Sequence, residues 1–245
     1  MSDTAALEAF LDKWRARWPE WRIAEAFVPA PQRAATLAWL ALRQELADAA
    51  WGGEDPRPGA AKLAWWVDEL QGWANGRRRH PLGLALQRIA APWEALAVAL
   101  PSLSTARALS IATPDDLSRW RAAIAPFADA GARVSAVVAG APAGADADAA
   151  DMRAHDLAAN DDSAFAVALG AMRALAGEGA DATTRAGLEA WPARAVGTRA
   201  DRIFAALARQ RLQALADGAG DGRTAASHWR SLWTAWRAGR SVPRA

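Results

Sequence analysis

The chain of 245 residues is long enough for one large domain with a substantial core, and 52% of its residues are hydrophobic. The absence of cysteine excludes disulfides, thiolate nucleophiles and cysteine-ligated zinc. The pI is about 9.8, but the net charge is only +2 and the arginines are scattered among acidic residues, so the composition argues against nucleic-acid binding.

Alanine and leucine dominate, β-branched residues are sparse, and apolar positions recur at spacings of three and four. This pattern predicts helix throughout. Prolines and capping residues mark the starts, most clearly in Thr113-Pro114-Asp115-Asp116, where an N-cap, an N1 proline and two acids follow one another. The predicted helices cover 4–17, 31–50, 59–75, 81–100, 113–139, 147–159, 162–176, 197–216 and 223–238.

The best linker in the chain is the stretch Gly140–Asp148, which is rich in glycine, alanine and aspartate. We expect this loop, near 140–150, to separate two halves of one domain that spans 1–245. Short polar connections elsewhere favour an antiparallel helical bundle.

No apolar run approaches the roughly 20 residues that a membrane-spanning helix needs. The first residues carry an acid, Asp3, and lack the basic-then-apolar order of a secretion signal. We therefore expect a soluble, cytoplasmic protein, with peripheral attachment at the inner membrane as the alternative.

Fourteen residues are tryptophan, and six of them form two stripes at the same i, i+4, i+7 spacing. The stripes are Trp14, Trp18 and Trp21 near the start, and Trp229, Trp233 and Trp236 near the end. The favoured interpretation is that both stripes are seams of the core that pack the two ends of the chain together. The alternative is an amphipathic surface for a membrane or a partner, because arginines flank both stripes.

Three stretches of the first half occur in a distinctive order. They are Ala26-Phe27-Val28-Pro29 with Arg33 following, Leu40–Asp48 (Leu-Ala-Leu-Arg-Gln-Glu-Leu-Ala-Asp), and Lys62–Leu70 followed by Arg79-His80-Pro81-Leu82. This order resembles the squalene/phytoene synthase family over residues 26–90. The resemblance implies a single-domain, all-α fold of the isoprenoid-synthase type around a central cavity. It also implies, for active members, prenyl diphosphates bound through Mg²⁺ that two acidic motifs hold, since magnesium prefers hard oxygen ligands.

The family's first acidic motif, Asp-Asp-x-x-Asp, aligns with Gln44–Asp48, whose leading position is the neutral Gln44. Glu45 and Asp48 remain, three residues apart on one helix face, and are candidate magnesium ligands. Arg43 and Gln44 join them as candidate ligand-binding residues. The alternative is an exposed acidic edge that pairs with Arg43 or with an arginine of a neighbouring helix.

The family's second motif aligns best with Leu169–Ala174. There Arg173 is a candidate ligand-binding residue, Ala174 replaces the leading aspartate, and Glu178 is the remaining candidate metal ligand. Three other acids are alternatives: Asp156, Asp161 and Asp162.

One carboxylate–cation contact at about 4 Å is worth roughly 4 kcal/mol at an effective dielectric of 20, so each missing acid weakens a metal–diphosphate site about a thousandfold. The resemblance therefore implies a non-catalytic or weakly active protein, for which we predict no cofactor other than Mg²⁺ if catalysis remains. Its expected ligand is a prenyl diphosphate or other isoprenoid lipid, or its partner a protein, with no nucleic acid. The first alternative is an active Mg²⁺-dependent prenyltransferase, whose Glu45 and Asp48 face at least two acids across an open cavity. The second is a structural interaction protein with an exposed apolar patch.

Other motifs are weak, and no metalloprotease, serine-nucleophile or Walker-type signature occurs. We expect Trp66 and Leu70 in the core, with Asp68 and Glu69 at the surface. His80 directly precedes Pro81 and is expected to cap or pack at the start of a helix.

Overall fold

The structure, a computed structural model, describes residues 2–141, 163–177, 182–218 and 227–240. Within these residues the regular elements are helices, and strand-like pairing is limited to one isolated parallel bridge between Ser163 and Val196. The prediction of an all-α protein is therefore confirmed.

The helices are as follows, with η for short 3₁₀ turns. They are α1 (Asp3–Arg17), α2 (Trp21–Ala24), η1 (Glu25–Phe27), η2 (Ala30–Gln32), α3 (Arg33–Trp51), α4 (Pro56–Ala74), α5 (Gly83–Leu86), α6 (Trp93–Ala99), α7 (Pro101–Arg107), α8 (Pro114–Val138), α10 (Ala164–Ala176), α11 (Ala182–Glu189), α12 (Arg199–Ala216) and α13 (His228–Arg240).

Capping chemistry sets the helix starts largely as predicted. At α8, Thr113 and Asp116 form a reciprocal capping box, in which each side chain accepts a hydrogen bond from the other's backbone N–H. The helix α4 begins at Pro56, three residues earlier than expected. The reason is that the Asp55 side chain accepts a hydrogen bond from the N–H of Arg57 and caps the helix there.

The prediction of one continuous helix over 81–100 is wrong. The segment is divided into the two short helices α5 and α6, and α7 follows it. Pro92 adopts φ −76° and ψ 63°, outside the helical region, and a proline also excludes the helical conformation from the residue before it. A second proline, Pro101, begins α7 immediately after α6.

In the second half, α10 and α12 lie close to their predicted ranges, whereas α11 was not predicted. The expected linker begins where predicted, because α8 ends at Val138 and Gly140 takes a positive φ of 90°. The rest of this linker and the helix expected over 147–159 lie outside the described residues.

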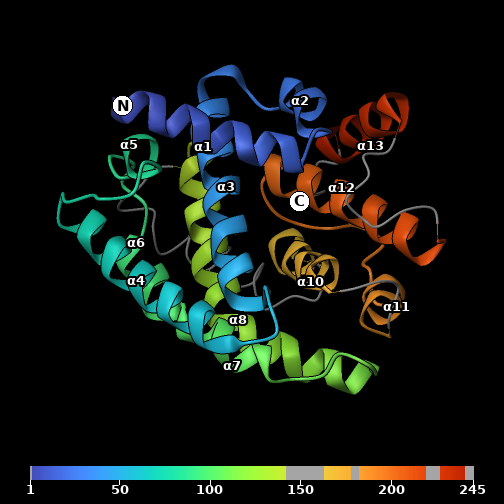
Figure 1. Cartoon of the computed structure of the whole chain (residues 1–245). Coiled ribbons are helices and arrows are strands. Elements are labelled where there is room, and N and C mark those ends of the chain that lie inside the picture. Colours follow the sequence, from blue (N-terminus) through green and yellow to red (C-terminus); the bar gives the residue numbers. More distant parts are fainter. Residues whose placement is uncertain (1, 142–162, 178–181, 219–226, 241–245) are drawn as a thin grey trace.

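The helix α3 runs through the middle of the molecule (Figure 1). α4 and α8 flank it on one side and α10 on the other, with α12 beyond α10. Consecutive residues such as Leu40, Ala41 and Leu42 are all buried, so α3 is covered on every face. Residues on its different faces therefore meet different neighbouring helices, which decides where the predicted site residues lie.

The two tryptophan stripes differ in environment. Trp14, Trp18 and Trp21 are buried and pack around Phe204 of α12, which confirms a core seam. In contrast Trp229 is 80% exposed and Trp233 is 58% exposed, so the prediction of a second core seam is wrong. The ends of the chain do meet, since α13 contacts α2, but the buried residues of α13 are the small Ser231, Ala235 and Gly239.

Candidate functional site

The predicted site residues on α3 do not converge on one point. Asp48 lies on the side that faces α1, where its Oδ2 accepts a 2.8 Å hydrogen bond from Nη1 of Arg17. Its Oδ1 accepts a second, also 2.8 Å, from Nε2 of Gln44. Gln44 in turn accepts a 2.9 Å hydrogen bond from the indole N–H of Trp18. Both oxygens of Asp48 are thus occupied, and its charge is neutralised by an arginine.

Glu45 faces a different helix. Its Oε2 accepts a 2.5 Å hydrogen bond from Nζ of Lys62 on α4. Asp48 and Glu45 therefore form separate ion pairs with neighbouring helices instead of sharing a cation between them. The alternative of an exposed, paired acidic edge is met only in part: both acids are paired, but they are partly buried, one partner is a lysine, and Arg43 pairs with neither acid.

Arg43 points into the core. It is fully buried, and its Nη1 donates a 2.6 Å hydrogen bond to Oδ1 of Asp201 on α12. Its guanidinium lies 4.1 Å from the ring centroid of Phe165 and 5.3 Å from that of Phe204. Burial lowers the pKa of Arg43, and Asp201 opposes that shift. The residue therefore joins α3 to α10 and α12, which is a structural task.

Asp201 is itself held on several sides. Its Oδ1 also accepts a 3.2 Å hydrogen bond from Ser135, whose hydroxyl accepts one of 2.8 Å from the indole of Trp39. Its Oδ2 accepts a 2.6 Å hydrogen bond from Thr198. Because a buried charge is tolerated only with such partners, this network fixes how α3, α8 and α12 pack.

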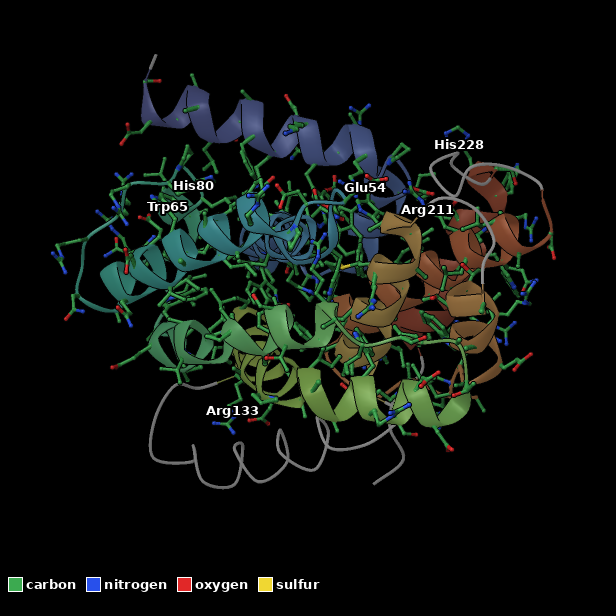
Figure 2. The ribbon with its side chains drawn as sticks, turned by 60° about the horizontal axis from the view of Figure 1, so that its bottom comes forward. Glu54, Trp65, His80, Arg133, Arg211 and His228 are labelled. Carbon is green, nitrogen blue, oxygen red and sulfur yellow. The ribbon has the colours of Figure 1, made fainter. Side chains whose placement is uncertain are left out.

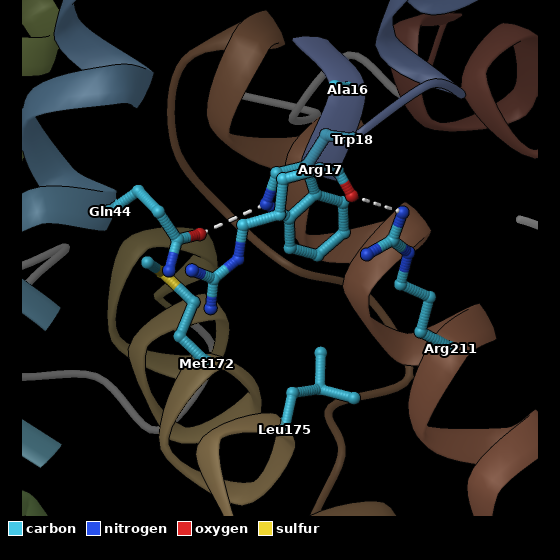
Figure 3. Close-up of a pocket in the computed structure, with 7 residues that line it drawn as sticks. All are labelled: Ala16, Arg17, Trp18, Gln44, Met172, Leu175 and Arg211. Carbon is cyan, nitrogen blue, oxygen red and sulfur yellow. Dashed lines mark hydrogen bonds between the residues drawn. The ribbon is translucent and has the colours of Figure 1, made fainter. Parts of the chain in front are cut away.

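A pocket of about 350 Å³ opens beside Arg17 and Gln44, the two partners of Asp48. It lies between the C-terminal end of α1 and helices α3, α10 and α12 (Figure 3). We call it the Trp18 pocket. It is lined by Ala16, Arg17, Trp18, Gln44, Met172, Leu175 and Arg211. Its wall combines the guanidinium groups of Arg17 and Arg211, each of which is paired with a carboxylate, with the apolar side chains of Met172 and Leu175. It therefore offers hydrogen-bond donors next to an apolar surface.

Arg211 forms one side of this pocket and is nearly fully buried. It makes a two-point ion pair with Glu20 at 2.8 and 2.7 Å and donates a further hydrogen bond to the carbonyl oxygen of Arg17. Its guanidinium also lies 3.9 Å from the ring centroid of Trp18. The partners Glu20 and Arg211 are 191 positions apart, so no local sequence signal could have predicted them.

Arg173 lies elsewhere, in a second pocket of about 280 Å³ that also contains Arg107. It donates to the carbonyl oxygens of Ala106 and Leu109 at the end of α7, and its guanidinium lies over the ring of Trp120. Burial lowers the pKa of Arg173, and the charge of Arg107 adds to that shift. Arg173 thus covers the end of a helix and lines a different pocket from Gln44, so the structure does not bring these two candidate residues into one pocket.

The described residues do not form a magnesium centre. Glu45 and Asp48 are each paired with a cation on a different side of α3. Among the described residues, no three or more histidines, aspartates and glutamates are grouped as a metal ion requires. Glu178 and the alternative acids, Asp156, Asp161 and Asp162, lie outside the described residues.

Glu69 was expected at the surface, and this prediction is wrong, since only 1% of its side chain is exposed. Its Oε1 accepts hydrogen bonds from the Trp73 indole and from the backbone N–H groups of Arg79 and His80, and its Oε2 accepts one from the Arg79 side chain. Burial alone would raise the pKa of Glu69, but these donors outweigh it and lower the pKa. The sequence feature that indicates this burial is the position of Glu69 between Trp66 and Trp73 on one helix face.

His80 lies among aromatic rings at the end of the molecule opposite Arg211 (Figure 2). Its ring is 4.7 Å from that of Trp66 and 4.9 Å from that of Phe10. Its Nδ1 accepts a 3.2 Å hydrogen bond from the N–H of Leu82, just before α5 begins, so the expectation that His80 packs at a helix start is confirmed. Burial lowers the pKa of His80 against the opposing charges of nearby glutamates.

Comparison with protein-family models, with curated proteins and with solved structures gave no match to this chain. In the part of the chain that the structure describes, no helix has the length and apolar character needed to cross a membrane.

Proposed function

We propose that this chain is a squalene/phytoene synthase-like protein of the isoprenoid-synthase type that has lost catalysis. It acts by binding an anionic isoprenoid lipid in the Trp18 pocket. The observation that carries the proposal is the state of Asp48, whose two oxygens are taken by Arg17 and Gln44 at 2.8 Å each.

Neutralised carboxylates cannot supply the charge that metal-assisted ionisation of a diphosphate needs. Asp48 would have to release Arg17, and Glu45 would have to release Lys62, before either could bind a cation. The amide at position 44 donates to Asp48, which an aspartate at that position could not do. Gln44 is thus matched to a paired, metal-free acid.

The chemistry of the Trp18 pocket supports an amphiphilic ligand. Arg17 is 44% exposed and uses one terminal nitrogen for Asp48, so its remaining donors are available to an anionic group. Met172 and Leu175 supply an adaptable apolar wall for a hydrocarbon chain. The volume of about 350 Å³ lies within the usual range of small-molecule sites.

The test is thermal unfolding of the full chain with farnesyl diphosphate, with and without magnesium, while diphosphate release is measured on the same samples. A ligand at a hundred times its Kd stabilises the native state by about 2.7 kcal/mol, which raises the Tm by about 5–10 °C. We expect this rise without magnesium and no diphosphate release.

The matched pair of variants is Arg17→Gln and Arg57→Gln, since each removes an arginine that pairs with one aspartate near the surface. Only Arg17 lines the pocket, so Arg17→Gln should reduce the ligand-induced rise in Tm and Arg57→Gln should not. Magnesium-dependent diphosphate release at ordinary enzyme rates would instead establish the active prenyltransferase. An unchanged Tm at all ligand concentrations would remove the lipid from the proposal.

A further inference from the structure

The helix α13 packs with its small residues inward and its large residues outward. Ser231, Ala235 and Gly239, spaced four apart, are buried against the body of the protein. A Cβ on Gly239 would lie 3.5 Å from Ile203 of α12 and 3.7 Å from Phe27, so the helices approach closely there. An amphipathic helix of a core normally does the reverse and buries its large apolar residues.

The outward face of α13 carries the tryptophans. Among the described residues, the large hydrophobic side chains that are exposed are Val98, Trp229 and Trp233, and two of these three are on this short helix. At 100° per residue, Trp229, Trp233 and the half-buried Trp236 fall on the side opposite Ala235. Exposed indoles gathered on one helix face indicate a surface that is covered in use.

The same face is strongly basic. From Gly222 to Ala245 the sequence has five arginines and no acidic residue. Three of them, Arg230, Arg237 and Arg240, are on α13 and exposed, and none forms an ion pair with a described carboxylate. Indoles and unpaired guanidinium groups therefore alternate over the outer side of one helix.

A groove of about 610 Å³ runs beside this face, between α13 and the turn that follows α2. Three arginines line it, Arg33, Arg199 and Arg240, together with Trp236. Arg33 and Arg199 donate to backbone carbonyl oxygens, and Arg240 lies over the ring of Trp236. Their positive charges are balanced by no described acidic side chain within bonding distance, which suits an anionic group in the groove.

We propose that the outer face of α13 docks on an anionic lipid surface, with Trp229 and Trp233 at the boundary between headgroups and acyl chains. A lipid phosphate would enter the groove at Arg240. Tryptophan prefers this boundary, and arginines are attracted to anionic headgroups, so both features of the face are used at once.

Charge complementarity favours an anionic lipid surface, and not a second copy of this chain, as the partner of the outer face of α13. A two-fold symmetric dimer through this face would bring Arg230 and Arg237 against the same residues of the other copy, and α13 offers no acid to separate them. A bilayer with acidic headgroups has no such conflict. The inference is independent of the proposed function, because the Trp18 pocket shares no lining residue with the groove.

The experiment is co-sedimentation of the full chain with vesicles, either phosphatidylcholine alone or equal parts phosphatidylcholine and phosphatidylglycerol. We expect binding to the anionic vesicles that weakens as salt is raised. Arg230→Gln with Arg237→Gln should weaken it about 25-fold, from about fivefold for each arginine. Trp229→Ala with Trp233→Ala should weaken it about tenfold or more.

The matched controls are Arg57→Gln and Val98→Ala, which remove an exposed arginine and an exposed apolar side chain elsewhere and should leave binding unchanged. Circular dichroism and the Tm verify that every variant folds. Equal binding to both vesicle types, or unchanged binding by the α13 variants, would overturn the proposal. The proposal would also be overturned if the α13 variants abolished a dimer seen by sedimentation velocity but left vesicle binding unchanged. It would be overturned as well if the chain bound inorganic phosphate but not vesicles.

Discussion

The two tryptophan stripes have the same spacing along the sequence but lie in different environments, since the first is buried and Trp229 and Trp233 of the second are exposed. Trp18, in the middle of the first stripe, is 2% exposed and lies 4.7 Å from the ring of Phe204. Trp233, in the middle of the second, is 58% exposed and stacks on Trp236 of its own helix. The first stripe spans the end of α1 and the start of α2, whereas the second lies on α13 alone. The same spacing therefore does not decide what surrounds the tryptophans, because that depends on the rest of the fold.

The two stripes differ in burial because of the other residues on α1 and α13. In α1 most charged residues, such as Asp12, Lys13 and Arg17, are exposed, and Leu7, Leu11 and Trp14 form the buried side, so burial of the tryptophan is favoured. In α13 a run of small residues lets the helix lie close to α12 and α2, and the tryptophans are left outside. The second stripe is therefore free to serve an external partner.

The largest expected effect tests this difference directly. Trp18→Ala removes a buried aromatic side chain and should lower the free energy of unfolding by about 3–5 kcal/mol. Trp233→Ala, at the equivalent position of the second stripe, should change it by no more than about 0.5 kcal/mol. Urea denaturation of both variants measures the contrast, and equal losses would mean that the second stripe is also part of the core.

A comparable effect is expected at the charged centre behind the first stripe. Asp201→Ala leaves Arg43 buried without its carboxylate and should cost about 3–5 kcal/mol. Asp48→Ala breaks the partly exposed pair with Arg17 and should cost about 1 kcal/mol or less. A double-mutant cycle with Arg43→Met measures the coupling, and a coupling near zero would show that Arg43 and Asp201 act separately.

A smaller effect should follow from enlarging the inner face of α13. Ala235 is fully buried, so Ala235→Leu overpacks the contact with α12 and α2 and should cost about 1–3 kcal/mol. Arg237→Leu adds an apolar side chain to the outer face of the same helix and should stay within about 0.5 kcal/mol. Chemical denaturation checks both, and a stable Ala235→Leu variant would show that α13 packs loosely.

The smallest effect concerns His80, a titratable residue that packs against Trp65 and Trp66 of α4. The pKa of His80 is lowered by burial, so the unfolded chain takes up a proton first as the pH falls. The stability that His80 contributes is therefore complete above about pH 6.5 and declines as the pH falls from there toward its lower folded pKa.

The Tm measured between pH 7.5 and 5.5 should fall in the unmodified chain and fall less in His80→Gln. Glu69, whose pKa is also lowered, contributes stability that is present above its ordinary pKa and is lost at still lower pH, as the pH falls through its folded value. A Tm that is independent of pH between 7.5 and 5.5 would contradict the role of His80.

Local chemistry allowed much of the fold to be predicted. The capping box at Thr113 and the proline at the start of α8 act through neighbours within one helical turn, and both were apparent from sequence. The break at Pro92 was missed because apolar spacing continued through it. Asp48 was predicted as a magnesium ligand, and its pairing with Arg17 was not predicted because Arg17 belongs to another helix, 31 positions away.

The sequence alone determined that this protein is helical and which side chains share a helix face, because both follow from interactions within a few residues. Only the tertiary structure decided that Asp48 and Glu45 are paired with cations, that Glu69 is buried, and that α13 turns its tryptophans outward. These outcomes depend on which helices lie side by side, and the burial energy of residues far apart in the chain sets that choice.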